Sequence, residues 1–198
     1  MKLAKIRIAL WVVVVLALAV YAFMQLRPAT LAPQGEPMDL RSSIGGAFTL
    51  VGADGQPFSS TQLDGRPHAI FFGFTHCPDV CPATLAKLVN YRKAIGEDAF
   101  DIVFISVDPK RDGPEEVGQY SDTFETPVIG LTGSQAQIDE VKELFGITSK
   151  EVDDGFGGYT VNHTSTVFLM DGDGNFISSL SPEEGREPSI AKLRRIAG

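Results

Sequence analysis

Residues 71–82 read FFGFTHCPDVCP and join an apolar half to a half that carries both cysteines of the chain. The apolar half belongs to the run AIFFGF at 69–74, and a continuous apolar run of this length before a Pro-rich break is typical of a strand buried on both faces of an α/β sheet. A helix is predicted from about 82 to 95, because apolar side chains then recur at helical spacing. The stretch therefore predicts a strand-to-helix turn at Cys77 and Cys81.

Strands and helices alternate along the rest of the chain. The predicted strands cover 47–51, 102–107 and 128–131, the predicted helices cover 115–124, 135–145 and 188–196, and a hairpin covers 164–170 and 175–180. Strands that alternate with helices and end in a hairpin predict an α/β fold with one mixed sheet.

An uncharged apolar run, IALWVVVVLALAVYAFM at 8–24, follows Lys2, Lys5 and Arg7. Its 17 residues are at the short end of what spans a bilayer as a helix, and the positive-inside rule places the preceding cations in the cytoplasm. We predict an uncleaved transmembrane anchor in preference to a cleaved signal peptide, because no convincing small-residue cleavage site follows. The expected localisation is a bacterial inner membrane, crossed once, with the C-terminal domain in the periplasm. A mitochondrial inner membrane is the alternative.

Composition divides the chain into three predicted parts. Residues 1–26 form a cytoplasmic stub and the anchor, 27–43 form a linker rich in Pro and polar residues, and 44–198 form one folded domain. The net charge of −8 understates the acidity of the domain, since every Asp and Glu lies after the apolar run. This acidity disfavours nucleic acid as a partner and favours a basic or cationic one.

The chain has only two cysteines, too few and too close in sequence for the disulfide framework of an exported protein. Cys77 falls at a helix start, where backbone N–H groups favour a thiolate, and Cys81 follows one helical turn later on the same face. The two sulfurs can therefore converge on one ion or close into a disulfide. Two thiolates form a soft site for Cu(I), Zn or related ions, which needs a third ligand to complete its coordination.

Three histidines are available as that third ligand. His76 is adjacent to Cys77 and is expected to point away from the chelate. His68 lies at the start of a predicted strand, where a packing or exposed role is expected. His163 lies in GGYTVNHTS at 157–165 and opens the predicted C-terminal hairpin.

Three motifs together resemble one family. FGFTHCPDVCP at 72–82, DPKRD at 108–112 and YTVNHTS at 159–165 are similar, in order and spacing, to the Sco/SenC family of copper-binding cytochrome c oxidase assembly proteins, over residues from about 45 to the C-terminus. One departure is Asn162, because the family often has Asp before this histidine. A neutral amide there removes a charge that could tune the metal.

The resemblance implies a thioredoxin-like fold, a mixed sheet flanked by helices, that carries copper as Cu(I) or Cu(II) on Cys77, Cys81 and His163. It also implies a metallochaperone that assembles the dinuclear copper centre of cytochrome c oxidase. The expected partners are the copper-bearing oxidase subunit and, beyond it, other copper chaperones or thioredoxin-like reductases.

A membrane-anchored thiol:disulfide reductase is the alternative function, with Cys77 and Cys81 as catalytic residues that keep the cysteines of the oxidase subunit reduced. A redox role needs only the two cysteines, whereas a copper role also needs His163. The histidine is present, and no Pro occurs in 159–167, where thioredoxin-like reductases usually place a cis-Pro. Both observations favour the copper role.

Two further expectations concern the surroundings of the site. Asp108 ends a predicted buried strand, and it either orients a ligand or partner or acts as a turn residue paired with Arg111. The segment 151–158 contains three glycines and is expected to be a mobile loop that lets His163 close on bound metal.

Overall fold

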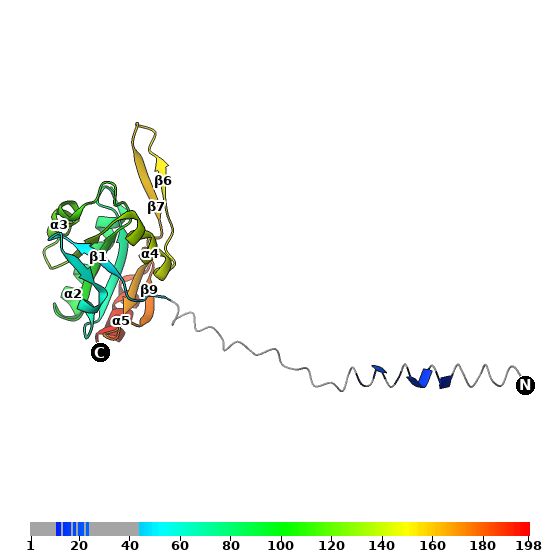
Figure 1. Ribbon diagram of the computed structural model, residues 1–198. Coiled ribbons are helices and arrows are strands. Elements are labelled where there is room, and N and C mark those ends of the chain that lie inside the picture. Colours follow the sequence, from blue (N-terminus) through cyan, green and yellow to red (C-terminus); the bar gives the residue numbers. More distant parts are fainter. Residues whose placement is uncertain (1–10, 13, 17, 19, 22, 24–43) are drawn as a thin grey trace, which may run out of the picture. The chain divides into compact units, whose positions relative to one another are not determined.

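The computed structural model describes residues 44–198 and part of the N-terminal segment (Figure 1). In that segment residues 11, 12, 14–16, 18, 20, 21 and 23 are described, and they are helical and exposed. Among the described residues, no helix combines the length and apolar character needed to cross a membrane. The described residues include nine of the 17 residues of the predicted anchor at 8–24, whereas the predicted linker at 27–43 lies entirely outside them. Both therefore stay predictions.

Residues from 44 onward belong to one compact unit built on a mixed sheet. In the described residues this sheet has seven strands in the order β2-β1-β5-β4-β3-β8-β9, and β6 and β7 form a separate two-stranded ribbon. The elements are β1 (Thr49–Gly52), β2 (Pro57–Ser59), the 3₁₀ helix η1 (Ser60–Leu63), β3 (His68–Gly73), α2 (Val80–Ile95), β4 (Asp101–Ser106), α3 (Pro114–Asp122), β5 (Ile129–Thr132), α4 (Gln135–Phe145), β6 (Ser149–Asp153), β7 (Tyr159–His163), β8 (Val167–Met170), β9 (Phe176–Leu180) and α5 (Arg186–Ala197).

Strand β3 is the centre of the fold and is buried along its whole length, as its apolar sequence predicts. It pairs parallel with β4 and antiparallel with β8, with Phe71 opposite both Phe104 and Val167. Because β3 and β4 are parallel, the segments that follow them leave the sheet at the same edge. Because β8 is antiparallel to β3, the residues just before β8 reach that edge too. Three segments that are distant in sequence therefore meet at the carboxyl end of β3.

Helices cover this sheet where the sequence predicts them. Helix α2 packs on α5, α5 packs on β8 and β9, α3 lies against β5 and β1, and α4 lies against β1. Helix α4 begins and ends where its sequence predicts, because Ser134 and Gln137 form a capping box at its start and Gly146 takes a left-handed conformation, with φ of 63°, at its end.

The segment before His163 differs from the expectation of a mobile loop over 151–158. Residues 149–153 form strand β6, which pairs antiparallel with β7 from Ser149 opposite His163 to Asp153 opposite Tyr159. Only 154–158 lie in the connecting turn, and the ribbon projects beyond the rest of the domain (Figure 1). The strand β6 could not be predicted from its sequence, SKEVD, because its residues are mostly polar and exposed and show no apolar alternation. Only its backbone pairing with β7 defines it as a strand. His163 therefore ends β7 and does not open the C-terminal hairpin.

The buried His68 makes the stability of the domain depend on pH. Its side chain is 5 % exposed, and burial lowers the pKa of His68 below its usual value although Nδ1 donates to the Arg66 carbonyl at 2.9 Å. The unfolded chain takes up this proton near pH 6.5, before the folded domain does, so the free energy of unfolding falls as the pH drops from about 7 through the lowered pKa of the folded domain. Urea unfolding across this window should show a shallower pH dependence for His68→Gln than for the wild type. Equal slopes would contradict the assignment.

Candidate metal centre

The two cysteines lie on the turn between β3 and α2. Cys81 is in the first turn of the helix and is fully buried, whereas Cys77 is half-buried, and both are free thiols. The backbone N–H of Cys81 donates to the Cys77 sulfur at 3.4 Å, so this sulfur is directed at the start of α2. Gly73 allows the end of β3 to approach, since a Cβ there would lie 2.9 Å from the Cys81 sulfur. The turn thus holds both sulfurs against the carboxyl end of β3.

His163 brings an imidazole to the buried cysteine. Its Nε2 lies 3.6 Å from the Cys81 sulfur, across 82 residues of sequence. Its Nδ1 lies 3.0 Å from the carbonyl oxygen of Thr164. Because a carbonyl oxygen can only accept, Nδ1 carries the proton and the lone pair of Nε2 faces the sulfur. This is the tautomer that a metal ligand needs.

The surroundings of His163 and Cys81 are apolar and keep both groups uncharged. The rings of Phe71 and Phe74 stand edge-on to the imidazole, with centroid distances of 6.2 Å and 5.8 Å. Burial lowers the pKa of His163, and burial together with the hydrogen bond to Cys77 raises the pKa of Cys81 well above its usual value. The metal-free centre therefore holds a neutral imidazole against a neutral thiol.

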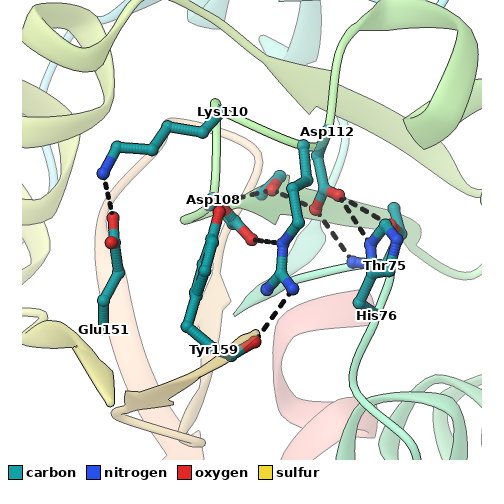
Figure 2. A network of polar contacts seen from close by, with 9 residues as sticks. Thr75, His76, Asp108, Lys110, Asp112, Glu151 and Tyr159 are labelled. Atoms are coloured by element: carbon teal, nitrogen blue, oxygen red, sulfur yellow. Dashed lines mark hydrogen bonds and ion pairs between the residues drawn. The ribbon is translucent and has the colours of Figure 1, made fainter. Parts of the chain in front are cut away.

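The other two histidines lie outside this contact. His76 is exposed, and its Nδ1 lies 3.0 Å from the Thr75 hydroxyl and 3.5 Å from Asp112 (Figure 2). His68 is buried at the opposite end of β3, which agrees with the packing role expected for it. Of the three histidines, the one from late in the chain is therefore the one that the fold brings to the cysteines.

Asp112 anchors the approach to the cysteine turn, and sequence reasoning did not assign it a role. Its side chain is completely buried and accepts hydrogen bonds from the Thr75 N–H at 2.8 Å, the Thr75 hydroxyl at 2.6 Å and the Ser106 hydroxyl at 2.6 Å (Figure 2). It links the loop after β4 to the residue two positions before Cys77. The signal in the sequence was its place as the last residue of the DPKRD motif.

Asp108 is a paired turn residue that also reaches the ribbon. Its carboxylate forms an ion pair with Arg111 at 2.6 Å and accepts a hydrogen bond from the Tyr159 hydroxyl at 2.9 Å (Figure 2). An exposed pair, Lys110 and Glu151, spans the same gap at 2.5 Å. The DPKRD loop therefore connects to the ribbon that ends in His163.

The donors present fit a soft metal ion. An ion bound about 2.3 Å from a sulfur and 2.0–2.1 Å from a nitrogen keeps these atoms about 3.5 to 3.8 Å apart at tetrahedral to trigonal angles. The observed 3.6 Å between Cys81 and His163 falls in this range. Within the part of the chain that the structure describes, no three His, Cys, Asp or Glu side chains are placed so that they could hold a metal ion together. Two of the proposed donors, Cys81 and His163, are already in contact. The third, Cys77, is held beside Cys81 by the hydrogen bond from the Cys81 N–H to its sulfur.

Comparison with known proteins gives a consistent assignment. A family model described as SCO1/SenC matches residues 36–198. A SCO2-like protein of Rickettsia conorii is 36% identical over 179 residues, which cover 85% of this chain and 87% of the relative. The chain belongs to the SCO1/SenC family. The predicted family membership is confirmed.

Solved structures of SCO1/SenC relatives have the same fold. The copper-bound ScoI of Bradyrhizobium japonicum is 39% identical and has a TM-score of 0.70 over 77% of this chain and 99% of that one. BsSco, described as a member of the Sco family of cytochrome c oxidase assembly proteins with a disulfide switch, is 26% identical and has a TM-score of 0.61 over 78% of this chain and 94% of that one. The predicted α/β fold, a thioredoxin-like mixed sheet flanked by helices, is therefore confirmed for the domain.

The position that departs from the SCO1/SenC pattern does not face the centre. Asn162 is exposed and pairs with Lys150 across the ribbon. Successive side chains of a strand point to opposite faces, so Asn162 is directed away from the side on which His163 meets Cys81. An effect of this amide on the metal through direct contact is not supported by its placement.

Proposed function

We propose that this chain binds copper through Cys77, Cys81 and His163 and delivers it to the dinuclear copper centre of cytochrome c oxidase. The observation that carries the proposal is the 3.6 Å contact between the Cys81 sulfur and the lone pair of His163. Two soft sulfurs and a neutral imidazole are a donor set that suits copper as Cu(I) and accepts it as Cu(II). The copper-bound state of the Bradyrhizobium relative supports the choice of metal.

The placement of the ligands on separate elements suits a carrier. The two sulfurs are fixed to the start of α2, whereas the imidazole sits at the end of a two-stranded ribbon outside the main sheet. A small movement of this ribbon takes one ligand away and leaves the ion on two sulfurs. An acceptor protein can then supply the replacement ligands.

A thiol:disulfide reductase is the second candidate, because two free thiols at i and i+4 adjoin the first turn of a helix. They can close into a disulfide, which removes both sulfur ligands and makes copper loading depend on the redox state. The disulfide switch named for BsSco supports a redox contribution in a relative. On this alternative the cysteines keep those of the oxidase subunit reduced.

We propose the copper-bearing subunit of the oxidase as the recipient, with other copper chaperones or thioredoxin-like reductases as further partners. One surface that suits docking is the turn of the ribbon, where Phe156 is 96% exposed. The Asp154 carboxylate accepts hydrogen bonds from the N–H groups of Phe156 and Gly158 at 2.8 and 3.0 Å, so the turn holds its shape. An exposed aromatic beside acidic residues fits an apolar pocket with a basic rim.

We further propose that residues 8–24 anchor the protein in a bacterial inner membrane, with the domain in the periplasm. The apolar run and the cations that precede it support this topology.

The test is a copper titration of the reduced protein with three chains: the wild type, His163→Ala and His76→Ala. His163→Ala is expected to lose copper affinity by roughly a hundredfold or more, since even residues outside the coordination sphere are typically worth 10–100-fold. His76→Ala is the matched control, because it removes an exposed imidazole next to Cys77 and should leave the affinity unchanged. Competition with a chromophoric Cu(I) chelator measures all three.

The same proteins are assayed for reduction of a model disulfide. If His163→Ala bound copper as tightly as the wild type and both reduced disulfides equally well, the reductase would become the better assignment. A selective loss of copper affinity with unchanged thiol chemistry supports the carrier.

A further inference from the structure

The ligands of the proposed centre come from two parts of the fold, the main sheet and the β6-β7 ribbon, and the centre forms only if the ribbon is held in place against the sheet. Cys77 and Cys81 follow β3 of the main sheet, whereas His163 ends a ribbon whose strands pair only with each other among the described residues. A two-stranded ribbon is marginally stable alone, so side-chain contacts must fix its position against the domain. Those contacts decide where the imidazole lies.

Arg111 makes several of these contacts. Its Nη1 donates to the Tyr159 carbonyl at 2.9 Å, and its guanidinium lies 3.8 Å from the centre of the Tyr159 ring. Its Nε donates to Asp108 at 2.6 Å, and the Tyr159 hydroxyl donates to the same carboxylate at 2.9 Å. Asp108, Arg111 and Tyr159 therefore each contact the other two, and together they link the segment that follows β4 to the first residue of β7.

The same guanidinium also faces the cysteine side of the centre. It lies 5.9 Å from the centre of the Phe74 ring, and this ring flanks the imidazole of His163 at 5.8 Å. The Phe74 carbonyl accepts the N–H of Cys77 at 3.2 Å. Arg111 is thus in contact with the start of the strand that carries the imidazole and with the residue that leads into the cysteine turn.

Burial makes this contact costly to lose. The Asp108 side chain is 1% exposed and that of Arg111 is 25% exposed, and Nη2 of Arg111 is buried without a hydrogen-bond partner in the described part of the chain. Removing one member of a buried ion pair leaves the other uncompensated, so the loop would rearrange rather than tolerate the gap. The exposed pair of Lys110 and Glu151 spans the same gap but is screened by solvent and contributes little.

We propose that Arg111 is a positioning residue that holds β7 against the cysteine turn and so keeps the His163 imidazole at the Cys81 sulfur. It acts on the metal only through His163 and is not itself a ligand. The inference deepens the proposed function and rests on it for its effect on copper, whereas its effect on the metal-free protein is independent of any metal.

The first experiment uses the metal-free protein. Modification of histidines by diethyl pyrocarbonate is followed by mass spectrometry at His163, with the exposed His76 in the same molecule as the reference rate. Arg111→Gln is expected to raise the relative rate at His163 several-fold, because the imidazole leaves its apolar position. Lys110→Gln is the matched control and should leave the ratio unchanged. An unchanged ratio in Arg111→Gln would overturn the proposal.

The second experiment is a double-mutant cycle on copper affinity. Arg111→Gln is expected to lower the affinity roughly tenfold in the wild type, within the range typical of residues outside the coordination sphere. In the His163→Ala background the same substitution should have no further effect, because the residue through which it acts is gone. An equal loss in both backgrounds would show that Arg111 acts on the cysteines or on the fold, and would refute the proposal.

Arg111→Lys covers the case in which Arg111→Gln does not fold. The lysine keeps the charge but cannot reproduce the forked contacts or the stacking on Tyr159, so it should shift both readouts in the same direction. If His163→Ala alone left copper affinity unchanged, the proposed copper site would fail while the modification ratio would still report on the positioning role.

Discussion

Replacing Cys81 with serine is expected to abolish functional copper binding, with an affinity loss of roughly a thousandfold or more, beyond the 10–100-fold typical of residues outside the coordination sphere. The buried sulfur of Cys81 is the atom that faces the lone pair of His163 at 3.6 Å. A serine hydroxyl is a hard, weakly acidic donor that does not compete for a soft ion at neutral pH. The substitution therefore removes one sulfur and leaves the imidazole without its partner. It is the largest effect on copper that a single substitution at the centre should produce.

The same variant tests the protonation state of the centre. Burial raises the pKa of Cys81, so its sulfur carries a proton in the metal-free protein throughout the neutral range. Copper must displace this proton, so binding to the wild type releases it and weakens as the pH falls. Proton release is measured with an indicator dye in weak buffer, beside the chelator competition. Cys81→Ser should release at least one proton fewer for each copper added.

The control for Cys81→Ser is Thr84→Ser, a conservative change of another buried residue of α2. This control should keep the copper affinity of the wild type, and circular dichroism should show that both variants are folded. A folded Cys81→Ser protein whose affinity stays within tenfold of the wild type would remove Cys81 from the ligand set.

Sequence reasoning predicted the parts of the fold that have an apolar period. The run that became β3 and the helix over 135–145 are examples, because burial and capping leave a local pattern. Strand β6 was missed because its side chains are polar and exposed, so only its pairing with β7 defines it. Only part of the apolar run at 8–24 is described, and no membrane-spanning helix is found among the described residues, so its prediction as an anchor rests on composition.

The candidate ligands were predictable by residue type, but their supports were not. The spacing of Cys77 and Cys81 and the family motif around His163 were enough to predict three metal donors. In contrast, the roles of Asp112 and Arg111 depend on which side chains the sheet brings opposite them. Asp112 meets Thr75 across 37 residues and Arg111 meets Tyr159 across 48 residues. A sequence period carries no information on such contacts. Asp112 was marked only by its place in the DPKRD motif, and for Arg111 only the local pairing with Asp108 was predicted.

Replacing Asp112 with asparagine is expected to lower the free energy of unfolding by about 3 kcal/mol, since hydrogen bonds to a buried charged group are worth about 1.5 to 3 kcal/mol and an unpaired buried group adds to the loss. One carboxylate oxygen accepts from both the Thr75 N–H and the Ser106 hydroxyl, and the other accepts from the Thr75 hydroxyl. An amide has the same shape but turns one of these acceptors into a donor. At least one of the three donors then faces an N–H₂ group in a site closed to water.

The comparison that isolates this effect is Asp139→Asn, which makes the same chemical change at a half-exposed carboxylate on α4 that pairs with Lys142. Surface pairs of this kind contribute less than about 1 kcal/mol, so Asp139→Asn should unfold close to the wild-type urea midpoint. Because the Thr75 N–H donates to the Asp112 carboxylate, Asp112→Asn should also speed hydrogen exchange of this amide, which lies two residues before Cys77. Equal urea midpoints for the two variants would mean that the buried carboxylate does not anchor the cysteine turn, and that the turn is held by the packing of β3 and α2 alone.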